Sequence, residues 1–183
     1  MSLARTTTTT RRQWLKAAVA FGSASAASGL VALVRTGGYA IEPAVAKDLA
    51  VFSPGQYVVA EALAGRIVAP DRPDDPSIPS AREVGVALFM DRYLAEMRPS
   101  MRRDLVRMLH YVEHLAPLGS GYVHRFSELR AEDQDEVLRA IATSRLEVLR
   151  AGFEGLKSLV MMGYYRDPRT WPILDYAGPT IGR

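Results

Sequence analysis

Apolar residues between positions 47 and 183 recur at intervals of three and four, the spacing that places side chains on one face of an α-helix. Ser53 followed by Pro54 is typical of a helix start, and the apolar repeat then continues to Pro70. The clearest face belongs to a helical pattern that begins at Ser80 and extends to Met97. It consists of Val86, Phe89, Met90, Tyr93, Leu94 and Met97.

Three more helices are predicted in the rest of this region. The first begins at Pro99 and ends near Pro117, the second begins at the acidic residues 132–136, and the third carries apolar residues from Leu146 to Val160. No segment alternates apolar and polar residues with the period of two that marks a strand. We therefore predict one all-α domain of about five helices at residues 47–183.

The chain changes character after Met162, where three Pro, three Tyr and one Trp fall within residues 163–179. Proline lacks the amide hydrogen that a helix interior needs, so the pattern predicts an irregular aromatic and Pro-rich tail rather than a helix. Aromatic rings in such a tail either pack on their own core or contact a partner, and the sequence is compatible with both.

Residues 1–46 form a separate basic and then apolar segment. The run Arg11-Arg12-Gln13-Trp14-Leu15-Lys16 is followed by an apolar stretch at residues 17–34. This run resembles a twin-arginine export signal, in which Arg11, Arg12, Trp14, Leu15 and Lys16 occupy the characteristic positions. The resemblance implies the twin-arginine translocase as a partner, transport of an already folded protein and a periplasmic location.

Two cleavage patterns of small residues follow the apolar stretch. They are Gly38-Tyr39-Ala40 and Ala44-Val45-Ala46, and the sequence does not choose between them or exclude an uncleaved anchor. An amphipathic helix packed on the domain is the alternative for residues 17–34, although that stretch shows no polar face.

The amino-acid composition excludes several classes of partner and cofactor. The net charge of +3 arises in residues 1–46, because the other residues include 18 basic and 19 acidic side chains, so we expect no nucleic-acid partner. The chain has no Cys, which excludes disulfides, thiolate nucleophiles, iron–sulfur clusters and CxxCH haem attachment within it. It also lacks a nucleotide-binding glycine loop. We therefore expect no cofactor in this chain.

His110, Glu113 and His114 form the pattern H-x-x-E-H, which occurs in zinc-dependent hydrolases. Histidines four residues apart lie on one side of a helix, and the intervening Glu can activate a zinc-bound water. Both histidines share that side with Arg103 and Arg107, nearly opposite the apolar face. We interpret the stretch as a solvated basic face and keep a secreted metal-dependent hydrolase as the alternative function.

Conspicuous residues in the helical region are Leu63, Ile67, Pro70, Gly85-Val86, Phe89-Met90-Asp91, Phe126, Leu129, Gln134 and Phe153. The ending is more specific and reads Gly163-Tyr164-Tyr165, Asp167-Pro168, Trp171 and Gly178-Pro179. Together they resemble the gluconate 2-dehydrogenase subunit 3 family over residues 54–180. Only Arg169 and Thr170 separate Pro168 from Trp171, where that family often has a longer stretch rich in Gly and Asn.

The resemblance implies a non-catalytic small subunit of an FAD-dependent sugar or alcohol dehydrogenase complex. In that family the FAD lies in a separate large subunit of the glucose–methanol–choline oxidoreductase type, and a multihaem cytochrome c carrying haem c commonly accepts the electrons. The small subunit brings the export signal, and the large subunit is its folded passenger.

The family provides no catalytic residue to transfer to this chain, so we predict a partner interface instead. The predicted interface residues are Tyr164, Tyr165, Asp167, Pro168, Trp171, Tyr176 and Pro179. Packing of the same residues on their own core is the alternative, and a free-standing periplasmic binding protein is a third interpretation of the whole chain.

Overall fold

The computed structural model describes residues 38–68 and 77–178. The twin-arginine pattern at residues 11–16 and Pro179 lie outside the described residues. The described part is helical and contains no strand, which confirms the predicted all-α class. No helix in this part is long and apolar enough to cross a membrane.

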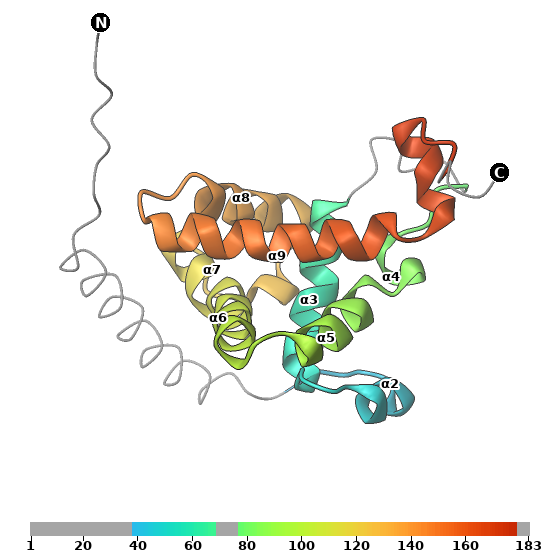
Figure 1. The fold of residues 1–183 in the computed structure, drawn as a ribbon. Helices are drawn as coiled ribbons and strands as arrows, with labels where there is room; N and C mark the ends of the chain where they lie inside the picture. Colours follow the sequence, from blue (N-terminus) through green and yellow to red (C-terminus); the bar gives the residue numbers. More distant parts are fainter. Residues whose placement is uncertain (1–37, 69–76, 179–183) are drawn as a thin grey trace, which may run out of the picture.

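Five long helices form the body, as the periodicity predicts (Figure 1). They are α3 (Pro54–Ile67), α5 (Val86–Glu96), α6 (Pro99–His110), α8 (Ala131–Ala142) and α9 (Glu147–Tyr165). Helix α9 runs across the body and contacts the other four long helices. Short elements connect the long ones: α2 (Pro43–Asp48), α4 (Ala81–Val84), the π-helical turn η1 (Tyr111–Leu115), α7 (Ala116–Gly119) and the 3₁₀ turns η2 (Phe126–Glu128) and η3 (Pro168–Leu174).

Polar side chains cap the N-termini of two of these helices. The Ser53 hydroxyl accepts a hydrogen bond from the backbone N–H of Gln56, while the Gln56 side chain accepts one from the backbone N–H of Ser53. Ser80 and Glu83 make the same reciprocal pair at α4. Each capping pair satisfies two backbone donors that a helix start leaves unbonded, so α3 begins where the Ser-Pro pattern predicts.

Glycines in α9 allow the neighbouring helices to approach it closely. A Cβ atom on Gly163 would lie 2.7 Å from the ring of Phe89 in α5. A Cβ atom on Gly152 would lie 2.9 Å from the sulfur of Met108 in α6. Side chains from these helices fill the core beneath α9, where Met90, Leu109 and Leu156 are fully buried.

The C-terminal region differs from the prediction of an irregular tail after Met162. Helix α9 continues to Tyr165, and residues Pro168–Leu174 form the 3₁₀ turn η3. Pro168 stands at the start of this turn, where no amide hydrogen is needed, so proline is compatible with helical structure there.

Candidate functional site

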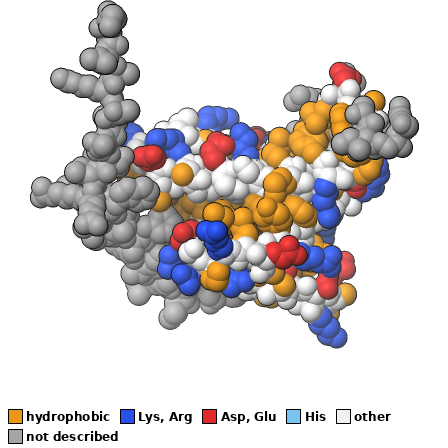
Figure 2. Space-filling model, in the orientation of Figure 1, with side chains coloured by type: hydrophobic (Ala, Val, Ile, Leu, Met, Phe, Trp, Pro, Cys, Tyr) orange, Lys and Arg blue, Asp and Glu red, His pale blue; other side chains and the backbone are white. Residues whose placement is uncertain are grey.

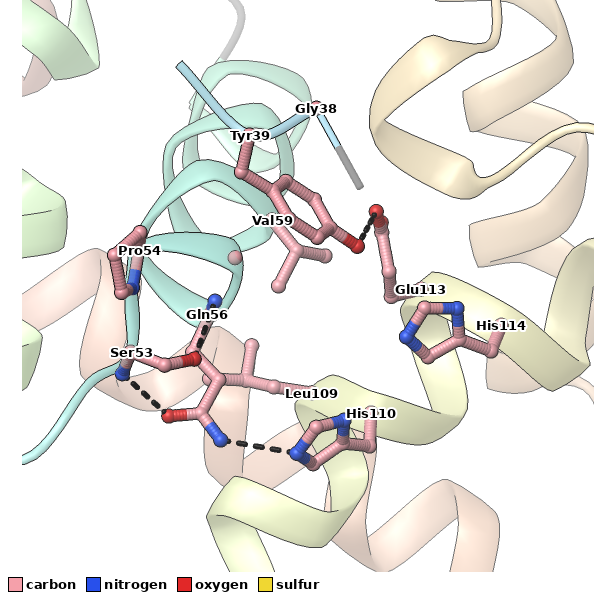
Figure 3. Close-up of a pocket in the computed structure, with 11 residues that line it drawn as sticks. Gly38, Tyr39, Ser53, Pro54, Gln56, Val59, Leu109, His110, Glu113 and His114 are labelled. Atoms are coloured by element: carbon pink, nitrogen blue, oxygen red, sulfur yellow. Dashed lines mark hydrogen bonds between the residues drawn. The ribbon is translucent and has the colours of Figure 1, made fainter. Parts of the chain in front are cut away.

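A cavity of about 350 Å³ lies between the start of α3 and the junction of α6 with η1 (Figure 3). Ser53 and Gln56 line its α3 side, and Tyr39 reaches it from the segment before α2. Its other side is lined by His110, Glu113 and His114. The cavity therefore brings the H-x-x-E-H residues together with a residue from the predicted Gly38-Tyr39-Ala40 cleavage pattern.

The prediction that these three residues lie on a solvated face is wrong for two of them. The exposed fraction is 2% for Glu113 and 4% for His114, whereas Arg103 and Arg107 are exposed as predicted. Glu113 stands four residues after the buried Leu109, so helical spacing already places it beside the apolar face. His114 lies in the π-helical turn η1, whose hydrogen bonds enclose one residue more than those of an α-helix.

The Glu113 carboxylate is the centre of a buried hydrogen-bond cluster. The Tyr39 hydroxyl donates to its Oε1 at 2.9 Å, and Ser127 donates through its hydroxyl to Oε1 at 2.6 Å and through its backbone N–H to Oε2 at 3.0 Å. The Arg125 guanidinium Nε lies 4.0 Å from Oε1. Burial raises the pKa of Glu113, and the hydrogen bonds from Ser127 and Tyr39 oppose that shift.

Tyr39 is held by both charged members of this cluster. The Arg125 guanidinium stacks 4.3 Å from the centre of the Tyr39 ring, and a second carboxylate, that of Glu128, pairs with the same guanidinium. Burial and the neighbouring Glu113 raise the pKa of Tyr39 to about 12. The phenol is therefore a neutral hydrogen-bond donor at neutral pH.

The arrangement does not resemble a zinc-hydrolase centre. The His110 and His114 rings stack with their centroids 6.1 Å apart, and Nε2 of His110 lies 3.0 Å from the Gln56 side-chain nitrogen. Figure 3 shows the Glu113 carboxylate directed at Tyr39 and away from both imidazoles. Within residues 38–68 and 77–178, no three metal-ligating side chains gather as a metal site requires. The hydrolase alternative thus gains no support from the geometry.

Asp91 has a structural role that the sequence analysis did not predict. Its buried carboxylate accepts hydrogen bonds from the backbone N–H groups of Ala50, Val51 and Phe52 at 2.7, 2.8 and 2.6 Å. These bonds fix the chain immediately before α3. The sequence signal that could have revealed it is an acidic residue directly after Met90 and three positions before Leu94, both of which lie on the predicted apolar face.

The predicted interface residues form a C-terminal module, which we define as residues 163–178. Tyr164 is buried, and its hydroxyl donates to the carbonyl of Pro79 at 2.8 Å, so its ring packs on the body rather than on the surface. Asp167 caps η3 by accepting from the backbone N–H of Arg169 at 2.9 Å. The Thr170 hydroxyl donates to the Asp167 carbonyl at 2.8 Å. The short Arg169-Thr170 link thus closes a compact turn.

Trp171 closes the module from the other side. Its indole N–H donates to the carbonyl of Tyr165 at 2.9 Å, and its ring meets Tyr176 edge to face at 5.2 Å. Gly178, at φ +98°, passes so close that a Cβ atom there would lie 2.9 Å from the indole. Tyr165 and Asp167 are half-buried, whereas Pro168 and Tyr176 are exposed.

Next to this module lies a second hollow of about 320 Å³, between α5 and the end of α9. The Arg166 guanidinium stacks 4.9 Å from the Phe89 ring, and Phe89 in turn contacts Tyr93 at 5.6 Å. Figure 2 shows apolar side chains gathered over η3 and the last turns of α9. The exposed large apolar residues of η3 are Ile173 and Leu174.

The protein is an all-helical body. In the cavity around Glu113 and in the C-terminal module, several of the predicted site residues form hydrogen bonds within the chain. Over residues 54–173 the sequence matches the family Gluconate 2-dehydrogenase subunit 3. The chain belongs to this family, as the ending of the sequence indicates. No curated protein and no solved structure showed significant similarity to it.

The family name describes a subunit of a gluconate 2-dehydrogenase complex, so association with other dehydrogenase subunits follows from membership. The match begins at the first residue of α3 and ends within η3. Trp171 therefore falls inside the matched region, whereas Tyr39, α2 and Tyr176 fall outside it.

Proposed function

We propose that this chain is a non-catalytic accessory subunit of a periplasmic, FAD-dependent sugar or alcohol dehydrogenase complex. The family match over residues 54–173 is the observation that carries the proposal, because it covers the five long helices of the body. The catalytic flavin is held by a separate large subunit of the glucose–methanol–choline oxidoreductase type, and a multihaem cytochrome c receives the electrons.

The chemistry of the cavity between α3 and η1 supports an accessory role. Glu113 provides the carboxylate among the residues that line this cavity. Both of its oxygens already accept hydrogen bonds from Ser127, and Tyr39 donates to one of them. Burial lowers the pKa of His110, so this imidazole is neutral at neutral pH. These groups bind one another and hold a segment of the chain in place, which is a structural use of the residues.

The large subunit binds at the C-terminal end of the body, over η3 and the hollow beside Phe89. Leu174 is 55% exposed and Tyr176 is 48% exposed, so both present apolar surface that a partner can cover. Arg92, Glu96 and Arg166 edge the adjacent hollow and place charged groups of both signs there. An aromatic and apolar centre with charged residues at its edge is typical of protein interfaces.

The chain also provides the export signal for the folded complex. Arg11 and Arg12 direct it to the twin-arginine translocase, and the large subunit crosses the membrane as its passenger. This role accounts for the pairing of an export signal for folded proteins with a body that needs a partner for activity.

Affinity purification of the tagged, exported chain from its native host tests the accessory role. We expect a coloured eluate with the absorbance of oxidised flavin, a large second polypeptide and no stoichiometric zinc. A colourless single chain that contains one zinc ion per molecule would contradict the proposal.

A pair of matched variants tests the interface. Leu174→Asp places a charge on the proposed surface, and we expect about tenfold less flavoprotein in the eluate, since a buried unpaired charge is costly. Leu146→Asp is the control, because Leu146 is 53% exposed but stands at the opposite end of α9. Equal recovery of flavoprotein with both variants would exclude this surface.

Replacement of both Arg11 and Arg12 by Lys tests the export role. Dehydrogenase activity should then remain in the cytoplasmic fraction, although the complex still forms. Unchanged activity in the periplasmic fraction would contradict the export role but leave the accessory role intact.

A further inference from the structure

Besides the exposed ion pair of Asp48 with Arg92, two hydrogen-bonded points attach the body to the segment that joins it to the predicted export signal. At the first, Tyr39 donates a hydrogen bond to Glu113, and its ring stacks on the Arg125 guanidinium. At the second, the backbone N–H groups of residues 50–52 donate to the Asp91 carboxylate. Residues 40–49 therefore form a loop between two fixed ends.

The first attachment point is shaped to the Tyr39 ring. A Cβ atom on Gly55 would lie 2.7 Å from Cε2 of Tyr39, so only glycine at position 55 lets the ring lie flat on α3. The acceptor, Glu113, is itself buried and held by Ser127. Withdrawal of Tyr39 would break its hydrogen bond to a buried carboxylate and expose its ring to water.

The loop between the two points is built differently. Helix α2 has six residues, none of them buried, and its N-cap makes no side-chain hydrogen bond. It projects from the lower edge of the body in Figure 1. A helix this short is marginal in water without packing, so it opens at low cost. Exposed loops of this kind are where proteases cut folded proteins.

Both predicted cleavage patterns fall within this segment. The first lies at the Tyr39 attachment point, and the second lies in the exposed helix α2. The small residues of both patterns are exposed: Gly38 and Ala40 in the first, Ala44 and Ala46 in the second. The patterns differ in their attachment, because Tyr39 in the middle of the first is held by Glu113 and Arg125, whereas the second lies in α2. We propose that the folded body shields the bond after Ala40 and presents the bond after Ala46 to a signal peptidase, so that the mature chain begins at Lys47. The inference rests on the proposed export function.

The chemical step is hydrolysis of one peptide bond. The bond between the Ala46 carbonyl carbon and the Lys47 nitrogen breaks, water supplies a hydroxyl group to the carbonyl carbon, and the Lys47 nitrogen gains the proton. The peptidase recognises the small side chains of Ala44 and Ala46, which stand three residues and one residue before that bond. Tyr39 leaves with the released segment.

Digestion of the purified full-length chain with purified signal peptidase in detergent tests the shield without any need for export. Intact mass should identify one large product, which comprises residues 47–183. In Tyr39→Ala, the product that begins at Ile41 should increase by about tenfold, because the lost hydrogen bond to a buried carboxylate no longer holds the segment. In Ala44→Glu the full-length chain should accumulate, and the added Tyr39→Ala change should restore cleavage after Ala40.

Tyr39→Phe and Tyr57→Phe form a milder matched pair. Each removes a phenol that donates to a Glu carboxylate, but the Tyr57 hydroxyl bonds to Glu61 within α3 and attaches no other segment. We expect more of the product that begins at Ile41 from Tyr39→Phe alone.

A wild-type product that begins at Ile41 would overturn the inference. Failure of the peptidase to cut the wild-type chain, or equal products from wild type and Tyr39→Ala, would do the same. Fractionation of cells separates this result from the proposed function. A chain that stays in the cytoplasm yet is cut after Ala46 in detergent contradicts export and supports the shield. An exported chain that begins at Ile41 supports export and overturns the shield.

Discussion

The segment before α3 is attached to the body by residues that lie far away along the chain, whereas the 3₁₀ turn η3 of the C-terminal module is closed by residues that lie close together. Tyr39 bonds to a carboxylate 74 positions away, and the Asp91 bonds span 39 to 41 positions. Trp171 and Thr170 bond to carbonyls within six positions. Two carboxylates, those of Glu113 and Asp91, therefore hold much of the first segment, whereas several local hydrogen bonds hold the turn η3.

The comparison predicts the largest effect for Asp91→Ala. The change leaves the backbone N–H groups of residues 50–52 without their acceptor, so the free energy of unfolding should fall by about 3 kcal/mol. Urea denaturation followed by far-ultraviolet circular dichroism measures this loss. Asp48→Ala is the control, because Asp48 and its partner Arg92 are both exposed, and we expect a change below about 1 kcal/mol. Equal effects would remove the distinction between the two carboxylates.

Gly163→Ala should have the next largest effect, on the packing at the start of the C-terminal module. The added methyl group would meet the Phe89 ring at 2.7 Å, so α5 must shift from α9 at a cost of about 2 kcal/mol. Gly65→Ala in α3 is the matched control, since a Cβ atom there meets nothing within 4 Å. That variant should gain about 0.5–1 kcal/mol from helix propensity. Thermal unfolding of both variants gives the comparison, and a stabilised Gly163→Ala would refute the close approach.

Thr170→Val tests whether the C-terminal module distributes its stability over several bonds. The Asp167 carbonyl loses the Thr170 hydroxyl at 2.8 Å but keeps the backbone N–H of the same residue at 3.0 Å. We expect a loss of about 1 kcal/mol, the value of one ordinary hydrogen bond. A loss as large as that of Asp91→Ala in the same urea titration would show that the module also depends on a single group.

The smallest effects are pH-dependent and should have opposite signs in the two regions. Burial raises the pKa of Glu113 in the folded chain above its ordinary value of 4.5. The protonated form is therefore favoured by folding, and its contribution to stability is full below pH 4.5 and is lost as pH rises through the folded-state pKa. The difference in unfolding free energy between wild type and Glu113→Gln should accordingly decrease with rising pH.

Asp167 should behave in the opposite way. Hydrogen bonds from Arg169 lower the pKa of its carboxyl from 3.8 to about 2. The ionised form is favoured by folding, so its contribution is present above pH 3.8 and is lost as pH falls toward 2. The difference in unfolding free energy between wild type and Asp167→Asn should show that loss in the same pH titration. The same sign of pH dependence for both residues would contradict the electrostatic contrast.

The difference between near and distant contacts also explains what the sequence could predict. The five long helices follow from local periodicity and from caps such as Ser53, whose partner is three residues away. The ending Gly163-Tyr164-Tyr165 indicated the family because its residues are adjacent in the sequence and can be recognised as one short pattern. The hydrogen-bond partners of Glu113 could not be predicted, because Tyr39 and Ser127 lie 74 and 14 positions away and no local pattern connects them to it.

The predicted interface shows the same limit. Tyr164 is of a residue type that is common at protein interfaces. Its hydroxyl, however, donates to the Pro79 carbonyl 85 positions away, and its ring is part of the core. Tyr176 and Pro168 are exposed as an interface requires. Aromatic composition alone does not distinguish the two cases, because burial depends on what the rest of the chain places opposite each ring.

The central claim is that this chain performs no catalysis and that a flavoprotein depends on it. The most direct test is dehydrogenase activity in the periplasmic fraction of the native host after deletion of this chain, with and without its restoration from a plasmid. We predict that deletion abolishes the periplasmic activity, that restoration recovers it, and that the purified chain alone is inactive. Full periplasmic activity in the deletion strain would contradict the account.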